Sequence, residues 1–171
     1  MGEILTVIVG IAVIIVFVWA MKKARKVQPH FDEMQLQLRA KGYAAAYVTS
    51  IIGMAAFMLL YETGKIDFID PAVCFMAVLM ASVAVFAVYC IRHEAFFSIG
   101  EKGNYYMLLC AAVVVLNGIS AATSIAGGGL MKDGRITFSG GAANVLTGLT
   151  FLAVFIALLV KKLGRGSEAD E

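Results

Sequence analysis

Five long apolar runs, none with a charged residue near its middle, constrain this chain more than any other feature. About 20 apolar residues make a helix of about 30 Å, which matches the hydrocarbon thickness of a bilayer. In hydrocarbon, backbone polar groups need internal partners, so such runs cross as helices. The predicted spans cover about residues 4–21, 43–61, 71–91, 105–126 and 141–160.

The composition agrees with a membrane protein. Hydrophobic residues make up 61% of the 171 residues and charged residues 15%, against about 45–50% and about 25% in soluble domains. We therefore expect an all-α integral membrane protein, with residues 1–171 forming a single membrane domain. The predicted fold is a bundle of about five transmembrane helices, with a short amphipathic cytoplasmic helix between the first and the second.

Positive charge predicts the orientation of the spans. The connections 22–42 and 92–104 and the tail 161–171 hold eleven of the Lys and Arg residues, whereas the loops 62–70 and 127–140 hold three. Lys and Arg are enriched in cytoplasmic connections. The sequence thus predicts a multi-pass protein of the plasma membrane with its N-terminus outside and its C-terminus in the cytoplasm. In residues 1–26 the positive charge follows the apolar run, the reverse of a signal peptide, so we expect a retained anchor.

The first connection holds a predicted contact surface for the membrane or a partner. Its basic cluster attracts anionic lipid at about 1 kcal/mol per charge. Pro29 suits the first turn of a helix, and the apolar side chains after it share one helical face. That pattern indicates a helix lying in the interface or merging into the second span. The predicted contact residues are Lys22, Lys23, Arg25, Lys26, Phe31, Met34 and Leu38. Topology control without any partner is the alternative.

Small and polar residues predict how the helices pack, because close approach and hydrogen bonds drive helix association in bilayers. With a symmetric loop between the second and third spans, Gly53, Ser50 and Ala46 would face Ala81, Ala84 and Ala87, in that order.

The fourth and fifth spans carry six polar side chains predicted to make interhelical contacts: Asn117, Ser120, Ser124, Asn144, Thr147 and Thr150. A symmetric loop pairs Asn117 with Thr150, Ser120 with Thr147 and Ser124 with Asn144, at about 0.6 kcal/mol per hydrogen bond. The alternative use of this face is a polar groove for a small solute.

The sequence favours no catalytic, cofactor or metal site. His30, Asp32 and Glu33 in one connection and His93 with Glu94 in the next would need to meet to bind a metal, and their spacing matches no ligand motif. The three cysteines lie in apolar runs and cannot all pair. The net charge of +2 gives no nucleic-acid footprint.

The loop 127–140 contains Asp133-Gly134, a hairpin-turn signal. Its short flanks leave a β-hairpin and an irregular loop both open.

The predicted function is a non-enzymatic interaction or accessory component of a membrane assembly. Its partners would be the lipid bilayer and another membrane or cytoplasmic protein or a second copy, with no nucleic acid and no cofactor. The alternative is a small-solute transporter or channel that uses the polar face of the fourth and fifth spans.

Overall fold

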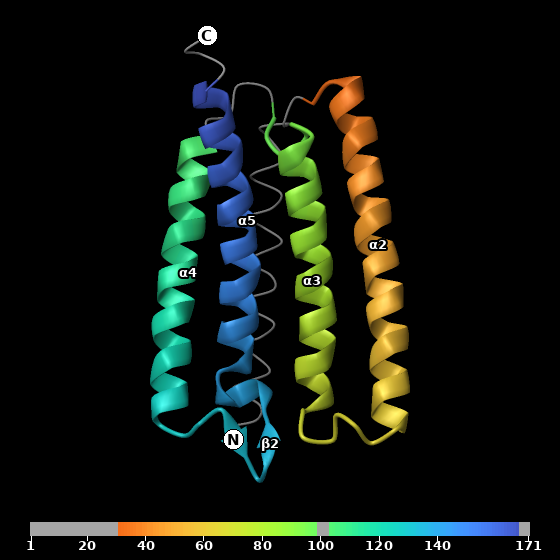
Figure 1. Cartoon of the computed structure of the whole chain (residues 1–171), viewed down its shortest axis with the longest axis vertical. Coiled ribbons are helices and arrows are strands. Elements are labelled where there is room, and N and C mark those ends of the chain that lie inside the picture. The colour runs from red at the N-terminus through yellow and green to blue at the C-terminus, as the bar shows by residue number, and fades with distance from the viewer. Residues whose placement is uncertain (1–30, 99–102, 168–171) are drawn as a thin grey trace, which may run out of the picture. The chain divides into compact units, whose positions relative to one another are not determined.

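A computed structural model describes residues 31–98 and 103–167, and most of these residues are helical (Figure 1). Four of its helices are long and apolar enough to cross a membrane. The predicted span 4–21 lies outside the described residues, so the single domain over 1–171 stays a prediction. The elements are α2 (Glu33–Glu62), α3 (Pro71–Arg92), α4 (Gly103–Ala126), β1 (Met131–Lys132), β2 (Arg135–Ile136), η1 (Phe138–Gly140) and α5 (Ala142–Ser167).

In the part of the chain that the structure describes, the amphipathic segment expected between the first and second spans is not a separate helix. A single continuous helix of 30 residues begins at Glu33. Nothing interrupts it at Gly42, the one glycine in its first half, because that residue is buried against Tyr89 and Cys90 of α3. The predicted interfacial segment has therefore merged into the span.

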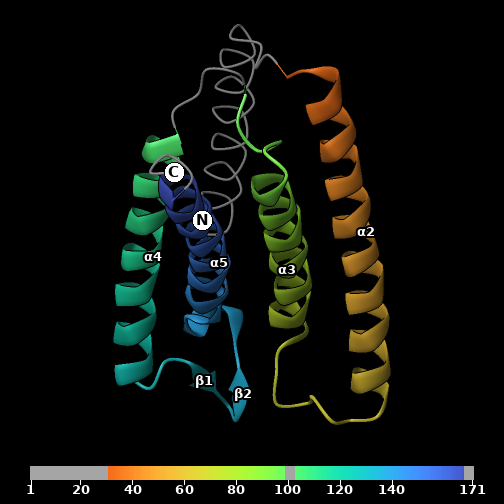
Figure 2. The same ribbon diagram turned by 45° about the horizontal axis from the view of Figure 1, so that its top comes forward.

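The helices form a row in the order α2, α3, α5, α4 (Figures 1 and 2). Close packing joins α2 to α3, α3 to α5, and α5 to α4. Neighbours in space therefore differ from neighbours in sequence at the middle of the row, where α5 inserts beside α3.

The α2–α3 contact corrects the predicted register. The hydroxyl oxygens of Ser50 and Ser82 lie 2.7 Å apart and share a hydrogen bond. A Cβ added to Gly53 would lie 2.9 Å from Cγ1 of Val78. Ser50 was expected beside Ala84, and Gly53 beside Ala81, which is exposed. The turn after α2 is asymmetric, because the N–H of Lys65 still bonds to the carbonyl of Leu60, so α3 starts at a different level.

The buried core lies between α3, α5 and α4, close to the connection that leaves α3. Ile91 of α3 is fully buried, and Cys110 of α4 and Leu158 of α5 pack in the same cluster. Ala87, which was expected to face α2, belongs to this cluster too. Phe96 and Phe97 cover it from the connection. We call this end of the row the junction end.

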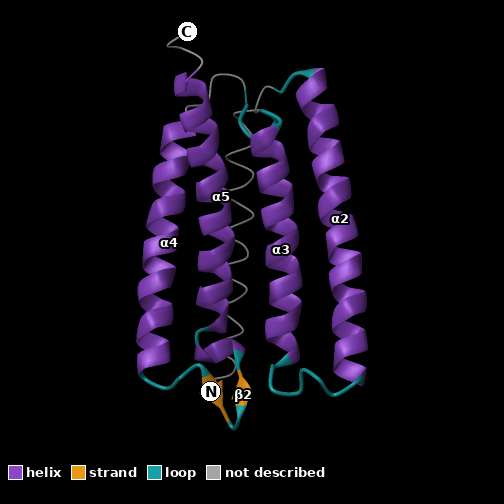
Figure 3. Cartoon of the chain, viewed as in Figure 1, coloured by secondary structure: helices purple, strands orange, loops and turns teal. Residues whose placement is uncertain are grey.

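The opposite end, here the hairpin end, carries the α2–α3 loop and a small β-hairpin (Figure 3). Asp133 and Gly134 both adopt positive φ, at 53° and 76°, which is the geometry of a two-residue type I′ turn. The hairpin interpretation of the loop 127–140 is therefore the one that the structure adopts. Its second strand also bonds the α2–α3 loop, since the N–H of Ile136 donates to the carbonyl of Phe68 over 2.8 Å.

Gly53→Ala is predicted to lower the free energy of unfolding by about 1–3 kcal/mol, because the new methyl overpacks against the branched side chain of Val78. Adding Val78→Ala should restore most of the loss. The matched control is Gly118→Ala on α4, where a Cβ would meet nothing within 4 Å and helix propensity alone favours alanine by about 0.5–1 kcal/mol. Unfolding in detergent measures all three, and equal effects at both glycines would contradict this interface.

Candidate functional site

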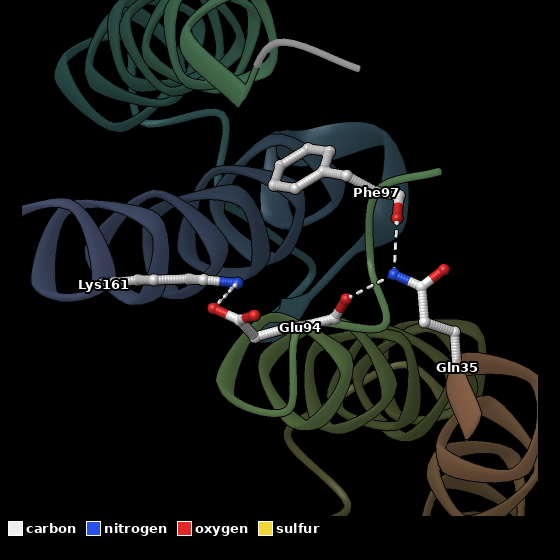
Figure 4. A network of polar contacts seen from close by, with 4 residues as sticks. All are labelled: Gln35, Glu94, Phe97 and Lys161. Carbon is white, nitrogen blue, oxygen red and sulfur yellow. Dashed lines mark hydrogen bonds and ion pairs between the residues drawn. The ribbon is translucent and has the colours of Figure 1, made fainter. Parts of the chain in front are cut away.

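The candidate site is the meeting point of three segments at the junction end, which we call the junction. It comprises Gln35 and Arg39 of α2, the connection 94–98, and Lys161 of α5. Figure 4 shows the side chain of Gln35 reaching backbone carbonyls of this connection, while Lys161 of α5 reaches the carboxylate of Glu94. Residues distant in sequence thus converge on one short stretch of irregular backbone.

A capping box starts α2 and prepares Gln35 for this contact. The carboxylate of Asp32 accepts from the N–H of Gln35 over 2.6 Å, and Oε1 of Gln35 accepts from the N–H of Asp32 over 3.4 Å. The Nε2 atom of the same amide then remains available as a hydrogen-bond donor. It donates to the carbonyl of Glu94 over 2.9 Å and to that of Phe97 over 3.5 Å.

Arg39, one turn further along α2, forms hydrogen bonds with the same connection. Its Nη1 donates to the carbonyl of Ala95 over 3.0 Å and to that of Phe96 over 3.4 Å. The guanidinium carbon lies 4.3 Å from the ring centroid of Phe31 and 5.6 Å from that of Phe86. Hydrogen bonds from a charged donor and stacking on rings are both stronger where water is sparse. Arg39 therefore satisfies backbone carbonyls that no helix or strand serves.

Glu94 ends α3 in a left-handed conformation, with φ of 60°. The N–H of Glu94 bonds to the carbonyl of Ile91, and that of Ala95 to the carbonyl of Cys90. This is the Schellman arrangement, whose left-handed position usually holds glycine. Here a glutamate takes it, and its carboxylate lies 3.6 Å from Nζ of Lys161. Because the glutamate side chain is 60% exposed, the ion pair contributes at most about 1 kcal/mol.

The structure describes only some of the predicted contact residues of the first connection. Lys22, Lys23, Arg25 and Lys26 lie outside the described residues. Met34 is exposed, Phe31 is half-buried beneath Arg39, and Leu38 is half-buried. Leu36, which is not among the predicted contact residues, is exposed as well.

The acidic and histidine residues of the two connections have local roles where they are described. Asp32 caps α2, and the ring of His93 lies 4.4 Å from that of Tyr89. His30 lies outside the described residues. Within residues 31–98 and 103–167, no group of three or more His, Cys, Asp or Glu side chains is placed to hold a metal ion.

The polar face of α4 and α5 has one interhelical hydrogen bond between its six predicted residues, from Nδ2 of Asn144 to Oγ of Ser120 over 2.8 Å. Asn117 and Thr150 instead donate to carbonyls of their own helices, those of Val113 and Leu146.

The level at which α5 begins explains this register. A Cβ on Gly141 would touch Ser124, so α5 starts about one turn nearer to the middle of α4 than the symmetric loop implied. Thr147 is half-buried. The predicted Ser120–Thr147 pairing is thus replaced by Ser120–Asn144.

Sequence reasoning missed Gln35 and Arg39, the two residues that make the junction. The pattern Asp32-x-x-Gln35 is a capping-box signature that would have located the start of α2. No local pattern could have shown that both side chains reach a connection about 60 residues away, since that contact depends on tertiary packing.

Within residues 31–98 and 103–167, these features define a helical protein with four helices long and apolar enough to span a membrane and a junction built from hydrogen bonds and an ion pair. No protein-family model, curated protein or solved structure matches this chain.

Arg39→Met is predicted to loosen the connection, because it removes two charged hydrogen bonds worth about 1.5–3 kcal/mol each while keeping an aliphatic side chain. Hydrogen exchange of the amides in residues 94–98 should become faster. Lys41→Met, on the same turns but exposed, is the matched control and should leave exchange unchanged. Unchanged exchange in the Arg39 variant would contradict the role given to the guanidinium.

Cysteines placed at Ser120 and Asn144 are predicted to cross-link rapidly in membranes, because the two side chains are in hydrogen-bond contact. The background replaces the three native cysteines by alanine. Cysteines at Ser120 and Thr147 should cross-link far more slowly, since that pair is displaced by three residues, or about 4.5 Å along the axis. The reverse order of rates would support the symmetric register instead.

Proposed function

We propose that this chain is a multi-pass protein of the plasma membrane that acts as a non-enzymatic interaction or accessory component of a membrane assembly. In this proposal five helices cross the bilayer as a bundle, and residues 4–21 form the first. The N-terminus lies outside and the C-terminus in the cytoplasm. The first turns of α2 then lie at the cytoplasmic surface, as the amphipathic segment of the sequence suggested.

One observation carries the proposal: large apolar side chains are exposed on the polar first turns of α2. Met34 is 71% exposed and Leu36 is 53% exposed, beside the polar residues Asp32, Glu33 and Gln37. Lipid tails cover exposed apolar side chains deeper in a span, but these two precede the predicted span 43–61. Met34 and Leu36 are two positions apart and point to different sides of the helix, so each offers a separate apolar contact to a protein partner among these polar residues.

The junction supports the same proposal, because it makes this surface rigid. Gln35 and Arg39 tie the first turns of α2 to the connection 94–98. A preorganised surface loses less conformational entropy on binding than a mobile one. Met34 and Leu36 are thus presented on a fixed support.

The distribution of charge supports the orientation. Arg39, Lys41, Arg92, Lys161 and Lys162 belong to the junction end. Only Lys65, Lys132 and Arg135 among the described basic residues belong to the hairpin end. Lys and Arg favour the cytoplasmic side.

The bonding of the polar residues favours this proposal over a transporter. Ser120 and Asn144 bond each other, and Asn117 and Thr150 bond their own helices. Side chains engaged in this way act as contacts between and within helices, which is the common use of such residues in membranes.

The test is affinity purification of the full chain from cross-linked native membranes, comparing two double variants. Met34→Gln with Leu36→Gln removes the proposed surface and should reduce recovery of a stoichiometric partner by about five- to tenfold, the effect of losing a binding hot spot. Phe68→Gln with Met131→Gln makes the same kind of change at exposed positions outside the predicted spans, at the hairpin end, and should leave recovery unchanged.

Two results would overturn the proposal. One is equal recovery of the partner with both double variants. The other is solute flux in vesicles reconstituted with the purified chain that is lost on Asn117→Leu, which would favour the transporter alternative.

A further inference from the structure

Besides the β-hairpin, the hairpin end carries a cleft lined by two cations and two carboxylates. Its volume is about 620 Å³, and its wall includes Lys132, Arg135, Asp70, Asp133 and Thr137. This is within the range of small-molecule sites, about 300–1,000 Å³. Two positive and two negative side chains give the cleft no net formal charge, which suits a ligand carrying both signs.

The hairpin brings the two cations together. Lys132 and Arg135 are cross-strand partners in the register of β1 and β2, so their side chains share one face of the hairpin. Like charges directly opposite each other destabilise a strand pair. Neither cation forms an ion pair with a carboxylate anywhere in residues 31–98 and 103–167. An anionic group placed between them would relieve this repulsion.

The carboxylate of Asp70 is held beside this pair by backbone bonds. The N–H of Asp70 donates to the carbonyl of Ile136 over 2.9 Å, so the α2–α3 loop is joined to β2 next to Arg135. One oxygen of Asp70 caps α3 by accepting from the N–H of Ala72, which leaves the other oxygen for a cationic group. The cleft therefore presents both signs of charge on a fixed frame.

An apolar groove adjoins the cleft. Its volume is about 350 Å³, and Ala72, Phe75, Leu79 and Phe138 are among its lining residues. Pro71 and Thr137 of the cleft are the chain neighbours of Ala72 and Phe138 of the groove, so adjacent residues line the two hollows. From Ala72 to Leu79 the groove follows α3 for about 10 Å, toward the middle of the predicted span.

We propose that cleft and groove together bind one phospholipid whose headgroup carries a phosphate and a primary ammonium. Its phosphate lies between Lys132 and Arg135, and its ammonium faces Asp70 and Asp133. One acyl chain follows the groove along α3. The inference rests on the membrane insertion contained in the proposed function and is independent of the partner surface on α2.

The test uses the full purified chain and measures lipid retention by native mass spectrometry and thermal unfolding in detergent. Added phosphatidylethanolamine should be retained and should raise the unfolding temperature. Phosphatidylglycerol, which lacks the ammonium, should bind about tenfold more weakly, the effect of losing one strong charged contact. Glycerophosphoethanolamine, which has the headgroup but no acyl chains, should also bind more weakly.

Two variants test the cleft and the groove separately. Lys132→Gln with Arg135→Gln should weaken phosphatidylethanolamine binding by about tenfold or more. Without lipid it should keep or raise the unfolding temperature, because the like-charge pair is gone. Ala72→Trp should fill the groove and weaken retention with all charges intact. Lys65→Gln with Asp67→Asn, exposed at the same end, is the matched control and should bind as the unaltered chain does.

Three results would overturn the proposal: unchanged phosphatidylethanolamine binding by the Lys132/Arg135 variant, phosphatidylglycerol bound as tightly, or glycerophosphoethanolamine bound as tightly. Alkaline carbonate extraction of the expressed chain tests membrane insertion separately. Retention in the carbonate-resistant fraction with no selective lipid binding overturns this site and leaves the proposed function standing.

Discussion

Helices of this composition gain little in a bilayer from burying apolar side chains against one another, because lipid tails are equally apolar. They associate where backbones come close or where polar side chains bond, and the α2–α3 and α4–α5 interfaces of this row contain such points. Gly42 and Gly53 bring α2 onto α3, with the Ser50–Ser82 hydrogen bond between them. The Ser120–Asn144 bond joins α4 to α5. Between α3 and α5 the packing rests instead on the buried cluster that contains Ile91 and Leu158.

The junction attaches α2, the helix at one end of the row, to the rest of the molecule a second time. Because α2 packs mainly on α3, its orientation would depend on one interface. Gln35 and Arg39 add a second attachment through the backbone of the connection 94–98. The same bonds satisfy carbonyls of the irregular connection after α3. The side chains of Gln35 and Arg39 thus both hold α2 in place and fix its first turns, where the proposed contact residues lie.

Much of the helical content could be predicted, because long apolar runs leave the backbone no other way to satisfy its hydrogen bonds. The start of α3 at Pro71 and the turn at Asp133-Gly134 also followed from local chemistry. The registers could not be predicted, since both loops are asymmetric and each displaces its helix pair by two or three residues. The junction was equally hidden, because Gln35 and Arg39 contact residues far away in the sequence.

The arrangement of the four helices in a row is tested most directly by the distance between α2 and α4, the helices at its two ends. Spin labels at Ile52 of α2 and Leu116 of α4, both exposed, lie at similar levels along the helices. Pulsed electron paramagnetic resonance on the full chain in lipid should give a backbone separation of about 20–30 Å, because three interhelical spacings of about 8–10 Å separate the two helices. A separation of about 10–14 Å, as in a closed four-helix bundle, would contradict it.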